Sequence, residues 1–287
     1  MWGESPVNCQ ELLFRSQNGL FERGEKTNKL MCLLAIQYRL NEETPILVAA
    51  NREEFYDRPS NPPSIQSGKP RILSGLDQQS GGTWLGVNQY GMFVGAANRR
   101  KLIPPVAPRS RGTLCKDLLR CTSAQEAMHL SMDELATNRY EGVNFVIADA
   151  ESGWIVHGGD EPEVVKLEEG LSLIANRNVN DPRDDRVLLA HRLLTLQTLD
   201  SPVKFLAVAS KAFARPATAP GRPSMVVRSK DRGTVSSTLL CLGEKPRDAI
   251  YQYAMGPPDE VRYEDYSPLL RDILSRGLRE ARTKAEA

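Results

Sequence analysis

The stretch that most constrains the fold of this chain runs from residue 31 to residue 100. Three short apolar runs in this stretch each end in a polar cluster, and the first begins with a cysteine, Cys32. Apolar runs of this length on either side of short polar turns predict β-hairpins. Because polar side chains gather at the strand ends, we expect a site to be built there. The runs that we expect to pair are residues 32–39 with 44–50, and residues 84–88 with 92–98.

Hairpins and helices alternate through the rest of the chain. Residues 58–70 are rich in Pro, Ser, Asn and Gly, which predicts a loop. A helical pattern over residues 113–130 is expected to break near Ser123, which can cap a new turn with Glu126 three residues later. We therefore expect a layered α+β fold with mostly antiparallel sheets. The other expected elements are hairpins over residues 143–157 and 164–176, helices over 184–198, 201–214 and 268–285, and a strand over 234–242.

The charge balance excludes several classes of partner. The 287 residues include 37 basic and 36 acidic side chains, so the net charge of +1 gives no general attraction to nucleic acid or anionic membranes. No apolar run of the sequence approaches the roughly 20 residues of a membrane span. The five cysteines include no CxxC pair, which argues against a disulfide framework and against a zinc site. We expect a soluble, cytoplasmic protein with no metal, no cofactor and no nucleic-acid partner; its oligomeric state stays open.

Residues 1–30 differ from the chain that follows them. They are polar and charged over most of their length, with little apolar surface to bury. We expect a disordered extension, or an artefactual one that precedes the true start of the protein at Met31. In the second case, removal of Met31 leaves Cys32 at the N-terminus. Residues 31–287 are expected to fold as a single domain.

Cys32 has a structural and a chemical interpretation. A cysteine that leads an apolar strand is most often a small buried side chain. As a nucleophile it would need a base, and an α-amine on the same residue, with a pKa near 8, can serve as one. The three histidines, His129, His157 and His191, lack the polar neighbours of a Cys-His site. Activation of Cys32 by its own amine is therefore the simplest chemical interpretation.

A dense polar cluster, residues 51–54, comes directly after the second apolar run. Ion pairs at a solvated strand end contribute little to stability. The antiparallel pairing predicted above would, however, bring this cluster close to Cys32. An arginine such as Arg52 then favours the thiolate, and a carboxylate such as Glu54 can hold an ammonium group.

Two asparagines and a group of basic residues complete the candidates. Asn98 and Asn176 each end an apolar strand, where asparagine is typical of turns; together they can also donate hydrogen bonds to an oxyanion. Arg99 begins a basic rim that continues through Arg100 and Lys101 to Arg109 and Arg111. This rim is either a solvated loop or a site of attraction for a carboxylate or phosphate of a substrate.

Several segments resemble the NRDE family, the family of transport and Golgi organisation protein 2 and its bacterial relatives. The likeness extends from residue 31 to about residue 242. It implies the four-layer αββα fold of the N-terminal-nucleophile hydrolases. Within these hydrolases the family is similar to penicillin V acylase and bile salt hydrolase, which cleave amide bonds through an N-terminal cysteine. The matching segments are Met31-Cys32 and residues 49–59, 72–77, 81–86 and 91–98.

The resemblance assigns roles to particular residues. Cys32 matches the nucleophile, and Arg52 and Glu54 fall where the branch places a charged pair near it, with Glu54 meeting the α-amine. Asn98 matches the oxyanion position and Asn176 a second polar position. The binding candidates beside these catalytic ones are Asn51, Trp84 and Arg99.

The chain departs from the family pattern at two positions. Glu53 stands where the family signature has aspartate. Val235 stands where the family has an arginine that would face the nucleophile, and Arg232 is the nearest substitute. Two functions are therefore open. One is Cys-dependent hydrolysis of a non-peptide amide bond in a small molecule; the other is binding or trafficking of a hydrophobic ligand, haem or lipid, without catalysis.

Overall fold

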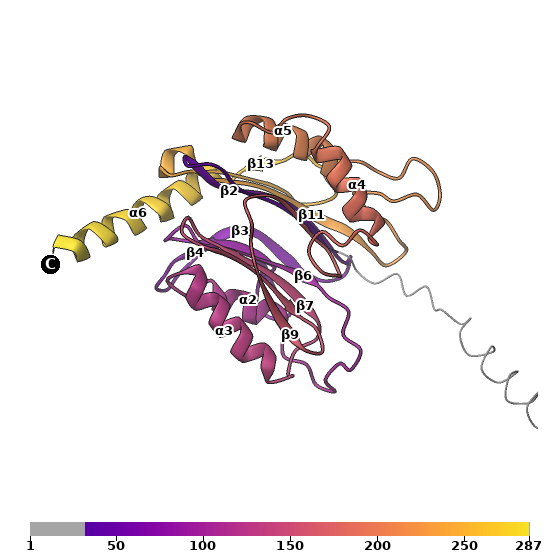
Figure 1. Cartoon of the computed structure of the whole chain (residues 1–287), viewed down its shortest axis with the longest axis horizontal. Helices are drawn as coiled ribbons and strands as arrows, with labels where there is room; N and C mark the ends of the chain where they lie inside the picture. The colour runs from indigo at the N-terminus through magenta and orange to yellow at the C-terminus, as the bar shows by residue number, and fades with distance from the viewer. Residues whose placement is uncertain (1–31, 287) are drawn as a thin grey trace, which may run out of the picture.

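Two β-sheets packed face to face, with helices on both outer surfaces, form the body of the protein (Figure 1). The computed structural model describes residues 32–286, so the extension expected at residues 1–30 lies outside the described residues. All pairings between the named strands of these sheets are antiparallel. The expected α+β architecture with antiparallel sheets is confirmed.

The first sheet has six strands in the order β10-β1-β2-β11-β12-β13. Its first hairpin is the predicted one, with Leu33 opposite Asn51 and Tyr38 opposite Ile46. The strand expected over residues 234–242 is β11, which pairs with β2 along ten residue pairs. The six strands are β1 (Leu33–Asn41), β2 (Thr44–Phe55), β10 (Gly170–Ile174), β11 (Arg232–Leu242), β12 (Ile250–Ala254) and β13 (Glu264–Asp265).

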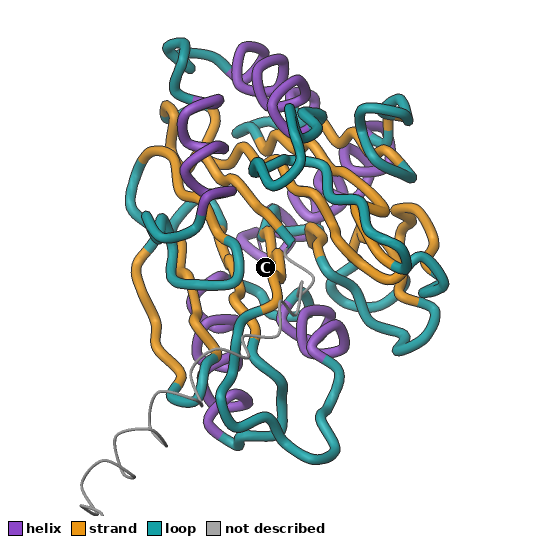
Figure 2. Tube along the Cα trace, turned by 90° about the vertical axis from the view of Figure 1, so that its right-hand side faces the viewer, coloured by secondary structure: helices purple, strands orange, loops and turns teal. Residues whose placement is uncertain are grey.

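The second sheet has seven strands, and each pairs with the next in the chain. The predicted hairpins over residues 84–98 and 143–157 are confirmed as β5–β6 and β7–β8. Figure 2 shows the strands of both sheets in orange and the loops that join them in teal. The seven strands are β3 (Ser60–Gln66), β4 (Ile72–Asp77), β5 (Leu85–Asn88), β6 (Phe93–Asn98), β7 (Val143–Ala148), β8 (Gly153–Gly158) and β9 (Pro162–Lys166).

Two local predictions were wrong. The hairpin expected over residues 164–176 does not form, because β9 pairs with β8 in one sheet whereas β10 pairs with β1 in the other. The loop expected over residues 58–70 contains strand β3, which has two prolines and an irregular register between Asn61 and Ser64. Proline is tolerated there because β3 is an edge strand, where one side needs no hydrogen bonds.

Four helices cover the outer faces of the two sheets (Figure 1). The break predicted near Ser123 is confirmed: the Ser123 side chain caps α3, and the Glu126 carboxylate accepts hydrogen bonds from Thr122. The helix expected over residues 184–198 is shorter and ends at Leu194. The helices are α2 (Arg111–Leu118) and α3 (Ala124–Ala136) on the seven-stranded sheet, and α4 (Asp185–Leu194) and α5 (Pro202–Phe213) on the six-stranded sheet.

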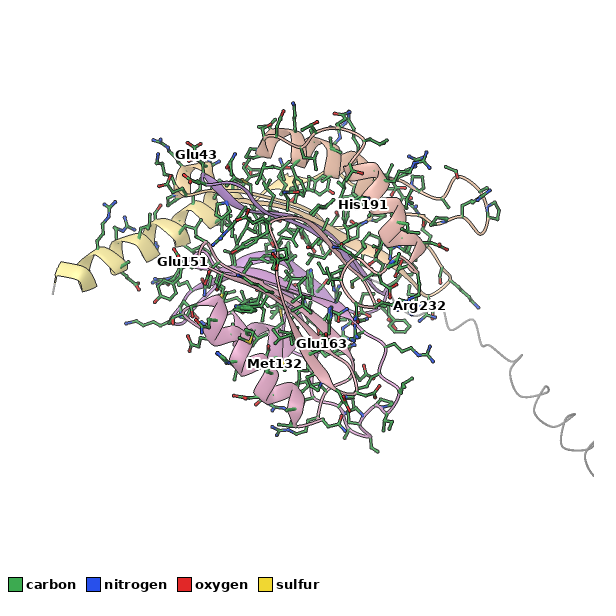
Figure 3. The ribbon with its side chains drawn as sticks, viewed as in Figure 1. Glu43, Met132, Glu151, Glu163, His191 and Arg232 are labelled. Atoms are coloured by element: carbon green, nitrogen blue, oxygen red, sulfur yellow. The ribbon has the colours of Figure 1, made fainter. Side chains whose placement is uncertain are left out.

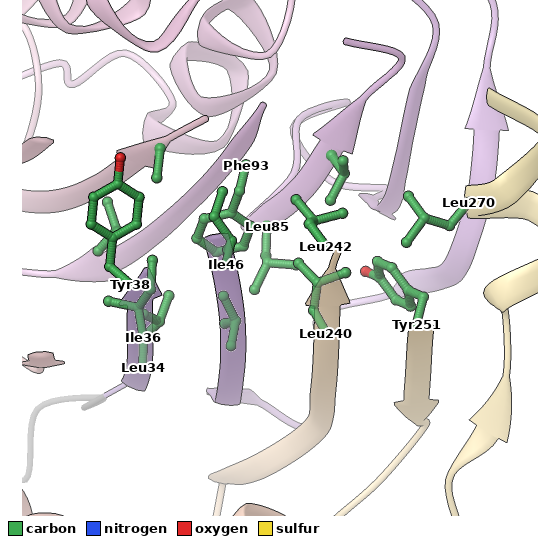
Figure 4. Packing of buried hydrophobic residues seen from close by; sticks show 14 of the residues in the cluster. Leu34, Ile36, Tyr38, Ile46, Leu85, Phe93, Leu240, Leu242, Tyr251 and Leu270 are labelled. Carbon is green, nitrogen blue, oxygen red and sulfur yellow. The ribbon is translucent and has the colours of Figure 1, made fainter. Parts of the chain in front are cut away.

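Alternation along each strand divides the core into three layers. On β1, Leu34 and Ile36 point into the space between the sheets, whereas Leu33 and Ala35 point toward α4 and α5. The cluster between the sheets is filled by large side chains such as Phe93 and Leu240 (Figure 4). Strand β2 alternates in the same way, which decides the surroundings of its polar residues.

The last helix, α6 (Ser267–Glu286), lies at one end of the sandwich and extends past it (Figure 1). Leu270, Ile273 and Leu274 are buried and pack into the cluster between the sheets. The opposite end is where β1 and β11 begin. In Figure 3, Glu43, in the turn between β1 and β2, and Arg232, at the start of β11, mark these two ends.

Candidate active site

Cys32 lies directly before β1, at the end of the sandwich away from α6. Its thiol is partly buried, and Sγ lies 3.7 Å from the main-chain oxygen of Glu53 on the neighbouring strand. A cavity of about 430 Å³ opens beside it; we call this the Cys32 cavity. Its wall includes Cys32, Arg52, Glu54, Trp84, Asn98 and Arg111.

The polar cluster at residues 51–54 lies inside β2, not after it as expected. The strand continues to Phe55 because β11 pairs with it, with Ser236 opposite Arg52 and Gly233 opposite Glu54. As a result, the four polar side chains alternate between two environments. Arg52 and Glu54 face the Cys32 cavity, and their charged groups lie 3.7 Å apart.

Arg52 is fixed by an aromatic partner. Its guanidinium stacks on the Trp84 ring at 4.2 Å, and its side chain is buried to all but 6%. Nη1 also lies 3.5 Å from the Ser60 hydroxyl. Cation–π stacking of a desolvated arginine, together with the Glu54 contact, holds the charged group in place. A positive charge is therefore directed at the cavity that contains the thiol.

Asn51 and Glu53 point the other way, into the layer of α4 and α5. The Asn51 amide donates hydrogen bonds to the carbonyls of Phe213 and Met225, at 3.0 and 2.9 Å. These bonds tie the end of α5 and the segment at Met225 to β2. The Asn51 side-chain amide thus joins β2 to the helical layer.

Glu53 forms a buried ion pair that the sequence did not suggest. Its Oε1 accepts hydrogen bonds from Arg186 of α4 at 3.0 Å and from Thr234 of β11 at 3.2 Å. Arg186 also donates to the carbonyls of Ser224 and Met225. Burial raises the pKa of the Glu53 carboxyl to about 7, although the Arg186 charge opposes the rise. No pattern in the sequence linked a helical arginine 133 residues away to this carboxylate.

The Cys32 thiol is protonated at neutral pH. Burial, and next the negative charge of Glu53, raise its pKa to about 12, while Arg52 lowers it. The thiol therefore needs a base before it can attack a carbonyl. None of the three histidines supplies one. His157 binds the Asn144 side chain and its pKa is lowered to about 4, chiefly by burial, whereas His129 and His191 are exposed on α3 and α4.

The two candidate oxyanion donors lie in different places. Asn98, the last residue of β6, lines the Cys32 cavity and also a second cavity of about 400 Å³ beside it. Asn176 lines the second cavity, and its main-chain oxygen accepts a hydrogen bond from Arg100. Asn98 is thus the asparagine that shares a cavity with Cys32.

Arg99 lies in the wall of the second cavity. Its Nη1 donates to Asn144 Oδ1 at 3.2 Å, and its Nη2 donates to Asn178 Oδ1 at 2.6 Å. Burial lowers the pKa of its guanidinium. The basic rim expected around it is divided: Arg109 lines the Cys32 cavity, Arg100 and Lys101 line the second cavity, and Arg111 lines both.

Val235 stands where the family resemblance places an arginine, and its apolar side chain supplies no charge near the thiol. It is the extra residue of an irregularity in β11, between the pairs Thr234–Glu53 and Ser236–Arg52. Arg232, the nearest substitute, stacks on the Phe55 ring at 5.5 Å and lines the second cavity. The buried positive charge close to Cys32 comes from Arg52 instead.

A second charged pair was also missed. Arg58 donates to Asp77 through two nitrogens, and Nη2 lies 2.6 Å from Oδ2. Both residues line the Cys32 cavity, and the Glu54 carboxylate lies 3.8 Å from Arg58. Both stand in the segments of the family resemblance, which was the available signal. This pair connects β4 of one sheet to the end of β2 in the other.

The comparison with known proteins agrees with this geometry. The family model described as "Transport and Golgi organisation 2" matches residues 31–245. The chain belongs to this family. The matched region contains Cys32 and the wall residues of its cavity, from Arg52 to Val143.

Curated relatives and solved structures extend the finding. The human transport and Golgi organization protein 2 homolog is 31% identical over 145 residues, which are 48% of this chain and about half, 52%, of that protein. The bovine homolog is 26% identical over 250 residues, 76% of this chain and 90% of that protein. Two variants of conjugated bile acid hydrolase from Clostridium perfringens share the fold at 12% identity, with TM-scores of 0.51 and 0.53. They cover 83% and 82% of this chain, and 93% and 92% of their own chains are matched. The fold is that of the N-terminal-nucleophile hydrolases.

Two further features bear on partners. Within residues 32–286, we find no group of three or more His, Cys, Asp or Glu that could hold a metal ion. In the same part of the chain, every helix is too short or too polar to span a bilayer.

Proposed function

We propose that this family member hydrolyses a non-peptide amide bond in a small molecule, with Cys32 as the nucleophile. The observation that carries the proposal is the common cavity: the Cys32 thiol, the Arg52 charge and the Asn98 amide line the same space of about 430 Å³. A nucleophile, a cation beside it and a hydrogen-bond donor are the groups that acyl transfer requires.

The proposed reaction has two halves. Sγ of Cys32 bonds to the carbonyl carbon, and the Asn98 amide donates to the oxyanion that forms. The base takes the thiol proton and passes it to the nitrogen of the substrate amide. The C–N bond then breaks, the substrate amine leaves, and an acyl-thioester remains on Cys32. Water then attacks the thioester, releases a carboxylic acid and returns the proton to the thiol.

The base in this proposal is the α-amine of Cys32, which requires a mature chain that begins at this residue. Glu53 supports the arrangement. Its Oε2 is buried and makes no hydrogen bond within residues 32–286. We propose that this oxygen, rather than Glu54, accepts from the amine. Although the Glu53 side chain turns toward α4, the residue also lines the Cys32 cavity, its main-chain oxygen lies 3.7 Å from the Cys32 thiol, and its charge acts on that thiol more than any other. Glu54 then holds Arg52 and Arg58 in position.

Intact mass is the first test. We expect protein expressed from Met1 and from Met31 to settle to one mass, that of a chain starting at Cys32. The mature protein should then release amine from a panel of N-acyl amides. Cys32→Ala should remove this activity, whereas Cys121→Ala, a change at a buried thiol on the α2–α3 connection, should retain it. Retention of Met31 in both preparations would refute the amine as base.

We propose the cytoplasm as the compartment of this activity. Cys115, Cys121 and Cys241 are buried thiols that form no disulfide within the described chain. Unpaired cysteines are typical of proteins from reducing compartments.

A second candidate function is the binding of a hydrophobic ligand, haem or lipid, without catalysis. A cleft of about 620 Å³ between α6 and the strand ends favours it; we call it the apolar cleft. Its wall includes Ile46, Leu242, Leu274 and Leu278. Titration with a fluorescent fatty acid distinguishes the two functions, because binding at the apolar cleft should survive Cys32→Ala while hydrolysis should not.

A further inference from the structure

We propose that the second cavity beside Cys32 binds an anionic group of the substrate, a carboxylate or a phosphate. We call this cavity the cationic groove. The inference rests on the proposed function, since it names the class of amide that the Cys32 cavity would receive. Six cationic side chains line the groove against two carboxylates, Glu54 and Glu141. The six are Arg58, Arg99, Arg100, Lys101, Arg111 and Arg232.

Two of the six charges are neutralised inside the protein. Arg58 is held by Asp77 at 2.6 Å, and Arg111 lies 3.3 Å from Glu141. Both carboxylates of the groove thus have arginine partners inside the protein: Glu141 pairs with Arg111, and Glu54 contacts Arg52 and Arg58. The remaining cations have no carboxylate of the groove wall to pair with.

Arg99 is a cation of the groove wall whose side-chain hydrogen-bond partners are neutral. Both of its terminal nitrogens donate to neutral amide oxygens, those of Asn144 and Asn178. It forms no ion pair among the residues that the structure describes. The acidic groups that affect its charge, Glu163, Asp160 and Asp181, act on it over longer distances. A guanidinium fixed by neutral partners keeps its full charge for a ligand.

Three other cations, Lys101, Arg232 and Arg100, line the same groove. Lys101 donates to the main-chain oxygen of Tyr140, again a neutral partner. Arg232 stacks on Phe55 and lies 3.6 Å from its chain neighbour Asp231. Arg100 is exposed. Carboxylate and phosphate groups are the anions that accept paired hydrogen bonds from such planar guanidinium forks.

The cationic groove lies next to the Cys32 cavity. The two share wall residues, among them Asn98, Glu54 and Arg111. A molecule whose amide reaches the thiol beside Asn98 can thus place a charged end in the groove. Volumes of about 430 and 400 Å³ are suited to a small molecule rather than a folded partner.

Binding to the Cys32→Ala protein tests the inference without depending on hydrolysis. Three matched probes share one acyl chain: N-octanoylglycine has a carboxylate, O-phospho-N-octanoylethanolamine has a phosphate, and N-octanoylethanolamine is neutral. We expect at least one anionic probe to bind about tenfold more tightly than the neutral one in calorimetry, with the preference weakened by salt. The better anionic probe identifies the source of the anion.

Three variants in the Cys32→Ala background locate the effect. Arg99→Gln and Arg232→Gln should each reduce the anionic preference about fivefold while binding of the neutral probe stays the same. Arg276→Gln, on the exposed face of α6, is the matched control and should leave the preference intact. Equal affinity for all three probes, or a preference that survives both groove variants, would overturn the inference. An anionic preference without any turnover in the wild-type protein would refute the hydrolase and leave the groove standing.

Discussion

At the end of the sandwich where β1 begins, charged side chains are buried, whereas at the end where α6 packs, the wall of the cleft is mostly apolar. The first end contains Arg52, Glu53 and Arg186, each with less than a tenth of its surface exposed. The second contains Leu242 and Leu274 around a cleft of about 620 Å³. The same two sheets form both ends, so the difference lies in the strand side chains and in the helix that covers each end, α4 or α6.

The comparison separates chemistry from stability. Buried charges are costly to desolvate and rarely add net stability, so their presence at one end indicates a chemical use. Buried leucines at the other end contribute by removing apolar surface from water.

Arg186→Met should destabilise the protein by about 3–5 kcal/mol at pH 8, where Glu53 is ionised in the folded protein, because it leaves this carboxylate buried without its ionic partner. Chemical denaturation measures the loss. The control is Arg276→Met at the other end, where the pair with Asp272 is exposed and a change under about 1 kcal/mol is expected. Adding Glu53→Gln to Arg186→Met should recover part of the loss. A loss no larger than that of the control would show that the buried pair does not contribute to stability.

Asn98→Ala should lower kcat for the proposed hydrolysis by about a hundredfold to a thousandfold, the usual effect of removing one oxyanion donor. KM should change little, since the donor acts on charge that develops in the transition state. Asn176→Ala is the matched change in the neighbouring cavity and should cost far less. If the two variants lose the same factor, Asn98 has no special place in the reaction.

The residues of this polar end show which features of the site could be predicted from the sequence and which could not. Cys32, Arg52, Glu54, Trp84 and Asn98 line one cavity, and the antiparallel hairpin already predicted that the cluster at residues 51–54 would approach Cys32. The side to which each residue points was not predicted. Because the polar cluster was interpreted as the end of a strand, the alternation that turns Asn51 and Glu53 toward α4 and α5 was missed.

Contacts between distant segments account for the other errors. Capping at Ser123 and the hairpins β5–β6 and β7–β8 depend on neighbours in the chain, so the sequence predicts them. The passage from β9 to β10 crosses from one sheet to the other, and local patterns contain no information about which sheet a strand joins. The Arg186–Glu53 pair is of the same kind, since α4 reaches β2 only through the folded layers.

The buried carboxyl of Glu53 at the polar end should make the free energy of unfolding depend on pH. Burial raises the pKa of Glu53 from its usual 4.5 to about 7, so the folded state holds a proton that the unfolded state releases between these values. Stability from this group is therefore fully present below about pH 4.5 and is lost as pH rises toward 7, by up to about 3 kcal/mol. Glu53→Gln should flatten the stability curve over that window. An unchanged slope in the variant would mean that Glu53 titrates normally.

Gly277→Ala tests the apolar end, where two effects of about 1 kcal/mol or more oppose each other. Alanine favours a helix interior over glycine by about 1 kcal/mol. A Cβ at position 277, however, would lie 1.9 Å from the main-chain oxygen of Gln89, which is backbone and cannot turn aside. The clash should win, displacing α6 and costing about 1–3 kcal/mol. Arg276→Ala, one residue away and exposed, controls for helix propensity and should change stability by less than about 0.5 kcal/mol. Because the Cys32 cavity lies at the other end, hydrolysis should persist in folded Gly277→Ala protein, while binding at the apolar cleft should weaken. A rise in melting temperature would instead mean that α6 is free to move away from Gln89, and that the apolar end is less tightly packed than the polar one.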